Sequence, residues 1–444
     1  MTSVEVPSAD LDPETASAGG SPEIQTAQAP LTPVGRLHLM LILGILTLIN
    51  IVNVMDRSLL SVLAEPIKRA FLLSDTQLGF LAGMAYALVY GVLALPISKI
   101  ADRGFYRPVI MICLAVWSSL TTIGGLSQTF WQLAMMRVGV AAGEAGLTPA
   151  SHALISRLFT PERRGRAIGF FSLGNPLGAA AGAVLAGLVA GAQGWRMAFF
   201  VIGPIGLVLL PLLLILPRFQ VAARSRNPVA WGEAFWLLAN RTYLKVWIAC
   251  ALASMFSFGG AAFTGPFFAR VHHMAIAQIG VVFGATALLG TAAGAFLGGV
   301  LFDLVKQRLP GWELYPSAIA LAASAGLALA AWLVPGTAPS IIALTAALFC
   351  YGLTAVPAMT VAQNLAPPDK RAGASALMGI STGVIGATCG PLLSGFLSDA
   401  FSARSNPHAL AYALCSLTVA LLGGAVAYAL AARDLRKAAR AAAG

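Results

Sequence analysis

The chain has 444 residues, of which 58% are hydrophobic and 10% are charged, and its mean hydropathy is +0.81. This usage is far more apolar than that of soluble domains and excludes a soluble globular protein. The formal net charge of +11 would suit a nucleic-acid partner only in a soluble protein.

Residues 1–35 differ in composition from the rest of the chain. They are rich in Ser, Ala and Pro, they include five acidic residues, and they have neither a basic start nor an apolar run. Such a segment buries too little apolar surface to fold. It predicts a disordered cytoplasmic tail rather than a signal peptide.

Apolar stretches long enough to cross about 30 Å of hydrocarbon as helices follow the tail. We expect twelve of them, at residues 37–62, 78–98, 108–127, 130–158, 166–191, 195–217, 243–268, 275–303, 313–334, 338–366, 372–397 and 408–431. The fold class is therefore an all-α membrane protein with twelve transmembrane helices. In the fifth stretch, Gly178, Gly182 and Gly187 favour close helix packing.

The Lys and Arg residues are distributed unequally between the two sides of this arrangement. One side, with both termini, holds 21 of them, and the opposite side holds 5. Because positive charge marks the cytoplasmic side, we expect both termini in the cytoplasm and the protein in a cell inner membrane. The basicity then reflects topology, and we expect no nucleic-acid partner.

Two halves of the chain repeat one plan. The loop TPERRGRA at 160–167 matches PPDKRAGA at 367–374, at an offset of 207 residues, and Asp102-Arg103 matches Asp303 at an offset of 201. Paired halves are one way to build a secondary transporter, with the substrate site where the halves meet. The predicted division is a six-helix bundle at 36–217, a cytoplasmic linker at 218–242, a second bundle at 243–434 and a cytoplasmic tail at 435–444.

The twelve spans and their acid-and-arginine loops resemble the major facilitator superfamily. Ser98 stands where that family's loop after the second span has a glycine. Within the superfamily, the run NVMDR at 53–57 and Arg137 with GEA at 143–145 resemble the Spinster subfamily. The resemblance implies a transporter working by alternating access, and proton-linked movement of amphiphilic lipids such as lysophospholipids or sphingoid phosphates.

Charged residues inside the spans are the candidate site, because intramembrane ionisable groups are costly and usually functional. Of the 17 acids, only Asp56 and Glu144 lie well inside spans. Arg137 and Glu144 are separated by two helical turns, about 10.5 Å, and share a helix face. Asp56 and Arg137 lie at similar depth and should pair, while Glu144 lies deeper and is the expected proton carrier.

Asp56 and Glu144 can couple protons to transport if their arginine partners change during the transport cycle. Burial favours the neutral form of a carboxyl group and a nearby guanidinium favours the ionised form, so a changing partner would drive proton uptake and release. Arg57 and Arg137 would form the charge network and meet the substrate head group. The alternatives are a permanent structural network and, for Arg57, a side chain that snorkels outward.

Two further groups complete the predicted site. Asp102, Arg103 and Asp303 would act as conformational latches that pair with loop arginines, or they are inert surface charges. An apolar cavity wall would suit the tail of an amphiphile, although such aromatic stripes are more often packing or lipid contacts. The residues predicted for this wall are Phe256, Phe258, Phe263 and Phe267.

Other chemistry finds no support in the sequence. There is no phosphate-binding loop for ATP, the GxSxG match at 379–383 lies inside a span rather than at a strand-to-helix elbow, and the five cysteines lack metal-ligand spacing. We expect no enzyme, no cofactor and no metal. The alternatives left are a proton-coupled drug or small organic-anion transporter of the same fold and, more distantly, a membrane sensor without transport.

Overall fold

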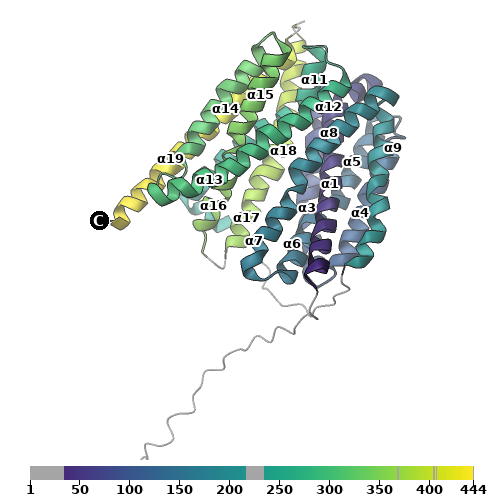
Figure 1. Ribbon diagram of the computed structural model, residues 1–444. Coiled ribbons are helices and arrows are strands. Elements are labelled where there is room, and N and C mark those ends of the chain that lie inside the picture. The colour runs from purple at the N-terminus through teal and green to yellow at the C-terminus, as the bar shows by residue number, and fades with distance from the viewer. Residues whose placement is uncertain (1–34, 217–234, 368–369, 404–405, 407, 444) are drawn as a thin grey trace, which may run out of the picture. The chain divides into compact units, whose positions relative to one another are not determined.

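A computed structural model describes residues 35–216, 235–367, 370–403, 406 and 408–443. The chain divides into two compact units, residues 1–40 and 41–444. In the first, the described residues start a helix in which Leu39 N donates to Gly35 O at 3.1 Å. The second holds the helical bundle (Figure 1). Nearly all of the predicted tail and most of the predicted linker lie outside the described residues.

Helices make up all the regular structure of the described residues. The first half contains α1 (Arg36–Phe71), α2 (Asp75–Gly79), η1 (Phe80–Met84), α3 (Ala85–Asp102), α4 (Tyr106–Gly124), α5 (Phe130–Glu144), α6 (Leu147–Leu158), α7 (Pro161–Ser172), α8 (Gly174–Gln193), α9 (Trp195–Leu209) and η2 (Leu210–Ile215).

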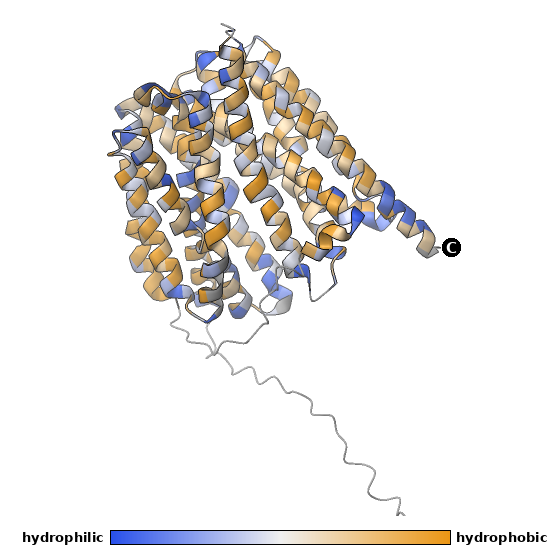
Figure 2. Cartoon of the chain, turned by 180° about the vertical axis from the view of Figure 1, so that it is seen from behind, coloured by the Kyte–Doolittle hydropathy of each residue, from blue (hydrophilic) through white to orange (hydrophobic). Residues whose placement is uncertain are grey.

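The second half repeats this pattern after a short 3-10 helix. It contains η3 (Trp236–Ala239), α11 (Arg241–Arg270), α12 (Ile276–Ala285), η4 (Thr286–Ala292), α13 (Ala293–Arg308), α14 (Tyr315–Leu333), α15 (Thr337–Gly352), α16 (Ala355–Asn364), α17 (Arg371–Gly379), η5 (Ile380–Gly386), α18 (Ala387–Ser402) and α19 (Ala409–Ala443). Hydrophobic residues cover the length of these helices, and hydrophilic ones gather toward their ends (Figure 2).

The described part of the chain has 11 helical stretches long and apolar enough to cross a membrane. The remaining predicted span, 130–158, is divided into α5 with 15 residues and α6 with 12. At the break, a Cβ on Gly146 would lie 2.6 Å from Cys113 Sγ, so the chain passes its neighbour at a distance that only glycine permits. The α15–α16 break falls 208 residues after the α5–α6 break, which agrees with the repeat of two halves.

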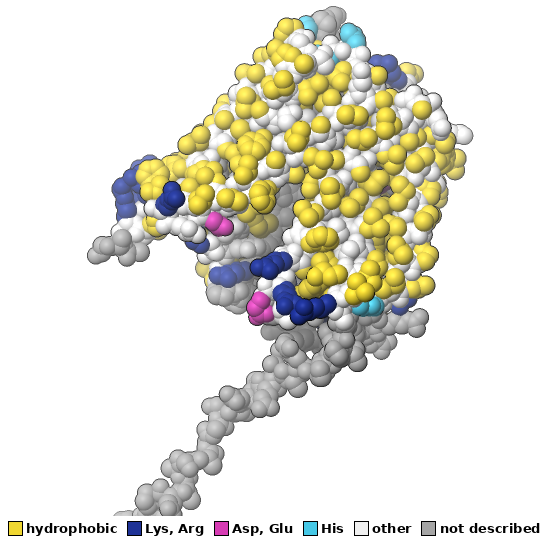
Figure 3. Space-filling view, viewed as in Figure 1, with side chains coloured by type: hydrophobic (Ala, Val, Ile, Leu, Met, Phe, Trp, Pro, Cys, Tyr) yellow, Lys and Arg dark blue, Asp and Glu magenta, His cyan; other side chains and the backbone are white. Residues whose placement is uncertain are grey.

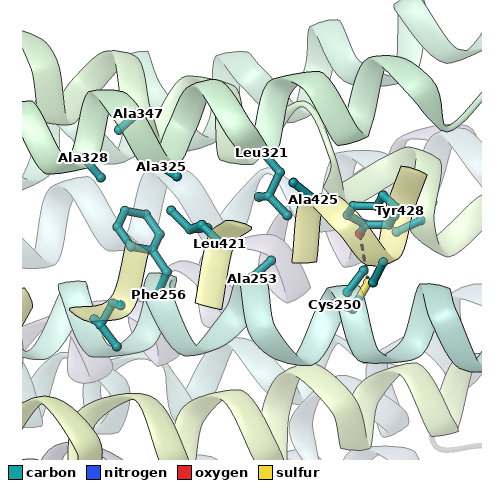
Figure 4. Packing of buried hydrophobic residues seen from close by; sticks show 14 of the residues in the cluster. Cys250, Ala253, Phe256, Leu321, Ala325, Ala328, Ala347, Leu421, Ala425 and Tyr428 are labelled. Atoms are coloured by element: carbon teal, nitrogen blue, oxygen red, sulfur yellow. Dashed lines mark hydrogen bonds between the residues drawn. The ribbon is translucent and has the colours of Figure 1, made fainter. Parts of the chain in front are cut away.

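Buried hydrophobic side chains from several helices of the second half pack together. Phe256 on α11 lies in one buried cluster with Leu321 on α14 and Leu421 on α19 (Figure 4). In the same cluster, Cys250 Sγ lies 3.2 Å from Tyr428 Oη. In the first half, Gly182 meets α1 so closely that a Cβ would lie 2.5 Å from Met55 Cα, as its spacing in the sequence predicts.

The two halves meet through α2 and η1 against α18, and through α8 against α12. At the second contact, a Cβ on Gly187 would lie 2.8 Å from Ile276 O and 2.9 Å from Gly280 Cα. We call the end of the bundle where α1, α11 and α18 finish and α2 begins the Asp75 end. The opposite end, where α13 finishes, is the Asp303 end.

Candidate functional site

Two ion pairs join α1 to α5 inside the first half. In the first, Arg137 Nη1 lies 2.9 Å from Asp56 Oδ2, and the two side chains are 4% and 3% exposed. Thr121 Oγ1 on α4 donates to the other carboxylate oxygen of Asp56 at 2.5 Å. The pairing expected from the depth of the two residues is therefore present, and it is sealed from solvent.

The second ion pair differs from the first in its exposure. Arg57 Nε lies 2.7 Å from Glu144 Oε2, and the Arg57 side chain is 36% exposed while that of Glu144 is fully buried. Arg57 Nη2 also donates to Asn53 Oδ1 at 3.0 Å. Arg57 therefore points into the bundle toward the buried carboxylate, and the snorkelling alternative is wrong.

Two tyrosines on α3 complete this pair, and sequence reasoning missed both. Tyr86 Oη donates to Glu144 Oε2 at 2.6 Å. The guanidinium carbon of Arg57 lies 5.1 Å and 5.2 Å from the ring centroids of Tyr86 and Tyr90, and the two rings stack at 5.6 Å. The sequence signal was available: two tyrosines four residues apart, on one helix face, within a predicted apolar span.

Several buried polar atoms near the ion pairs have no hydrogen-bond partner among the described residues. They include Glu144 Oε1, Asn53 Nδ2 and Arg137 Nε. A buried polar atom without a partner costs free energy, so it usually marks strain, function or hydration. Oε1 of Glu144 can take a proton without breaking either hydrogen bond at Oε2.

The predicted aromatic wall is wrong for three of its four residues. Phe256 is 1% exposed, and Phe263 and Phe267 are fully buried. The physical reason is that all three are packed inside one buried cluster: Phe267 packs edge-on against Trp332 at 4.9 Å, and the Phe256 ring lies 6.4 Å from that of Tyr351. Phe258 is 42% exposed and keeps its predicted role as a hypothesis.

The predicted latches are unpaired in this conformation wherever the structure describes their side chains. Arg103 and Asp303 are exposed, and neither takes part in the ion pairs of the described residues. The side chain of Asp102 lies outside the described part. Arg164 Nη2 instead donates to Ser156 O at 2.8 Å. The latch role remains a prediction about a different conformation.

A charged network that the sequence did not indicate joins the halves at the Asp75 end. Arg270 on α11 donates through Nη1 and Nη2 to the two oxygens of Asp75 on α2, at 2.9 Å each. Its Nε donates to Glu65 Oε2 on α1 at 2.7 Å. Asp75 also pairs with Lys68 at 2.5 Å and accepts from Ser398 Oγ on α18 at 2.6 Å.

A second link lies beside this network. The carboxylate of Asp399 on α18 accepts from the backbone N–H groups of Asp75 at 2.9 Å and Thr76 at 2.8 Å, and from Thr76 Oγ1 at 2.6 Å. An acid from the second half thus satisfies the free N–H groups at the start of α2 and interacts favourably with its helix dipole.

The described residues of the two halves form no such link at the Asp303 end. Within the described residues, every ion pair between the halves involves Arg270 and lies at the Asp75 end. On the face drawn in Figure 3, Lys and Arg side chains gather toward the Asp303 end, and the surface is hollowed between the halves above them. Among the described residues, the ion pairs between the halves thus close the Asp75 end.

Comparison with known proteins decides the family. The model of the Major Facilitator Superfamily matches residues 46–387. The chain belongs to this superfamily. It is a transporter and not an enzyme, and the twelve-helix fold expected from the sequence is confirmed.

The similarity extends to particular members of the superfamily. The chain is 34% identical to an MFS-type efflux pump of Mycolicibacterium smegmatis over 89% of this chain and 92% of that protein. It is 25% identical to the sphingosine-1-phosphate transporter SPNS2 of Danio rerio over 80% of this chain and 75% of that protein.

A solved structure agrees with these relatives. The crystal structure of a bacterial homologue of the human lysosomal transporter Spinster, inward-facing and unoccupied, matches with a TM-score of 0.83 and 27% identity, covering 91% of this chain and 98% of that one. The resemblance to the Spinster type, drawn from NVMDR and GEA, is confirmed.

Proposed function

We propose that this transporter couples substrate movement to protons, with Glu144 as the proton carrier. The observation that carries the proposal is the contrast between the two ion pairs. Asp56 and Arg137 are sealed, whereas Arg57 is partly exposed and holds a buried carboxylate through one oxygen. We assign the sealed Asp56–Arg137 pair a supporting part in coupling, because it joins α1 to α5, the same two helices that Arg57 and Glu144 join.

Protonation of Glu144 would act on Arg57. A charge-assisted hydrogen bond is roughly twice as strong as a neutral one, so neutralising the carboxylate weakens its hold on the guanidinium. Arg57 then has donors to offer to an anionic head group on its exposed side. The proton and the head group would thus act on neighbouring groups of one site, which is what coupling requires.

The favoured substrate is an amphiphilic lipid of the lysophospholipid or sphingoid type. Its support is the similarity to proteins of the Spinster type, one of them named for sphingosine-1-phosphate. Guanidinium groups suit the phosphate of such a head group. The buried phenylalanines Phe256, Phe263 and Phe267 give this choice no support.

A drug or small organic anion is the second candidate. The relative with 34% identity carries the name of an efflux pump rather than of a lipid transporter. Arg57 with its stacked tyrosines would bind a carboxylate as readily as a phosphate, because both accept two hydrogen bonds from one guanidinium.

We propose that the Asp75 end faces away from the cytoplasm, in agreement with the charge bias of the loops. Both termini and the linker are then cytoplasmic, the protein lies in the cell inner membrane, and the structure is inward-facing. When the cytoplasmic side closes, Asp102, Arg103 and Asp303 would pair with loop arginines. The six-helix bundles at 36–217 and 243–434 would be the parts that move.

Transport in proteoliposomes tests the proposal. Purified protein should accumulate a fluorescent lysophospholipid when a proton gradient is imposed, and an ionophore that collapses the gradient should stop it. Unlabelled lysophospholipid should compete better than small organic anions; the reverse order would select the second candidate. A substrate flux that is the same with and without the proton gradient would contradict coupling.

A further inference from the structure

One face of α19 is exposed along most of the helix. The exposed apolar residues on this helix recur at intervals of three, four or seven residues, as expected for a single face. From the first to the last the helix rises about 27 Å, close to the thickness of about 30 Å of a hydrocarbon core. These residues are Tyr412, Val419, Leu422, Val426 and Leu430.

The same face continues past Leu430 but changes its chemistry. Arg433, Lys437 and Arg440 are exposed and fall within an arc of about 60°. They lie one to three turns beyond Leu430, so the face passes from apolar to basic at the depth where the lipid phosphates begin. Figure 3 shows Lys and Arg side chains gathered on this projecting end of α19.

Residues on either side of this face hold the extension against the second half. Lys245 on α11 pairs with Asp434 at 2.5 Å. The Arg436 guanidinium lies 4.1 Å from the centroid of the Trp312 ring. Gly311, at φ +86°, brings the backbone so close that a Cβ there would lie 2.9 Å from Arg436 Cα. These contacts hold the part of α19 that carries the basic residues in a fixed position.

We propose that Arg433, Lys437 and Arg440 form a binding site for the head groups of anionic phospholipids in the adjacent leaflet. Basic side chains next to a membrane span attract anionic lipids, and arginine binds phosphate through two donors at once. In the described part of the chain, none of the three takes part in an ion pair. Their charge is available to a lipid.

Helix α13, whose following loop contacts α19, shows the same pattern. Leu297, Leu301 and Leu304 are exposed at helical spacing, and the exposed Arg308 follows one turn later. The loop after Arg308 contains Gly311, which contacts Arg436 on α19. Two exposed apolar stripes thus each end in basic residues. The site is independent of the transported substrate.

Lipid binding to the full-length protein tests the inference. Purified protein in neutral detergent would be titrated with phosphatidylglycerol or with phosphatidylcholine of the same acyl chains, and bound lipid counted by native mass spectrometry. We expect a preference for phosphatidylglycerol that falls at least tenfold in the triple variant R433Q/K437Q/R440Q. The swap R433K/K437R/R440K keeps all three charges and should keep the preference.

A control variant that removes three other positive charges distinguishes binding at this site from a general effect of the protein's net charge. The variant R163Q/R166Q/R241Q removes three exposed arginines elsewhere and should bind phosphatidylglycerol as the unmodified protein does. An equal loss in this control, or an unchanged preference in R433Q/K437Q/R440Q, would overturn the inference. So would full competition by inorganic phosphate, because the site would then bind any anion rather than a lipid.

Discussion

Arg57 holds Glu144 through one carboxylate oxygen only. Its Nε lies 2.7 Å from Oε2, which also accepts from Tyr86 Oη at 2.6 Å, while Oε1 accepts no hydrogen bond from the described residues. The two oxygens therefore have different tasks. Oε2 positions the group against α1 and α3, and Oε1 is where a proton can be added.

The first prediction is that Glu144→Gln abolishes proton-driven accumulation. The amide keeps the shape of the side chain but cannot titrate, so gradient-driven uptake into proteoliposomes should fall to the level of protein-free vesicles. Substrate binding should be partly retained. Glu313→Gln is the matched control, because it removes an acid that lies in a loop between spans. Full accumulation by Glu144→Gln would exclude Glu144 as the proton carrier.

The second prediction separates Tyr86 from Tyr90. A hydrogen bond to a charged group contributes about 1.5–3 kcal/mol, and Tyr86 donates one to Glu144. Tyr86→Phe should lower proton-driven transport, while Tyr90→Phe, which keeps its ring beside Arg57, should transport nearly as the unmodified protein does. Initial rates over a pH series measure both variants. Equal losses of transport activity in the two variants would mean that the hydrogen bond from the Tyr86 hydroxyl has no special part in transport.

The third prediction is coupling between Asp56 and Arg137. Removing one partner of a buried ion pair leaves the other charge uncompensated, at a cost of about 3–5 kcal/mol. Asp56→Asn and Arg137→Gln should each destabilise the protein, and the double variant should lose less than their sum. A double-mutant cycle from denaturant unfolding in detergent should give an interaction energy above about 0.5 kcal/mol. Strict additivity would contradict the pairing.

This pair also shows what the sequence can predict. Helical rise fixes the depth of a residue in its span, and depth alone brings Asp56 next to Arg137. Rotation about the helix axis is harder to predict. Asp56 and Arg57 are about 100° apart, yet both face helices of the first half, because α1 is packed by neighbours along most of its length.

Rotation also explains the error over the aromatic wall. Spacing shows that Phe263 and Phe267 share a face of α11, but not whether that face points to the other half or to its own. The structure buries both in one cluster, which is formed mostly by the second half and includes Ala64 and Leu78 of the first. The network of Arg270 was missed for another reason: its partners Glu65 and Asp75 lie 205 and 195 residues away in the other half, and how the halves meet depends on conformation.

The fourth prediction concerns topology. With the five native cysteines replaced, a single cysteine at Ala275, in the exposed turn before α12, should react with an impermeant thiol reagent in intact cells. A single cysteine at Ser225, which lies outside the described residues, should react only after the membrane is opened. The reason is the excess of Lys and Arg on the side of the linker. The opposite labelling pattern would invert the orientation.

The fifth prediction is that Arg270→Gln opens the Asp75 end. Losing one partner of a buried charge pair costs about 3–5 kcal/mol. Arg270 is 24% exposed, so solvent reduces this penalty, but about 1.4 kcal/mol is already enough to change a conformational ratio tenfold. The buried Asp75 loses two hydrogen bonds in this variant. This loss destabilises only the state in which the Asp75 end is closed.

Distances between spin labels at Gln128 and Ser402 would measure the opening, since both residues are exposed at this end and belong to different halves. Arg270→Gln should shift the distribution toward longer distances. Lys245→Gln is the control, because it breaks the pair with Asp434 at 2.5 Å inside the second half and should leave the distribution unchanged. If Arg270→Gln also leaves it unchanged, the link through Asp399 and the helix contacts at Gly187 are sufficient to hold this end closed.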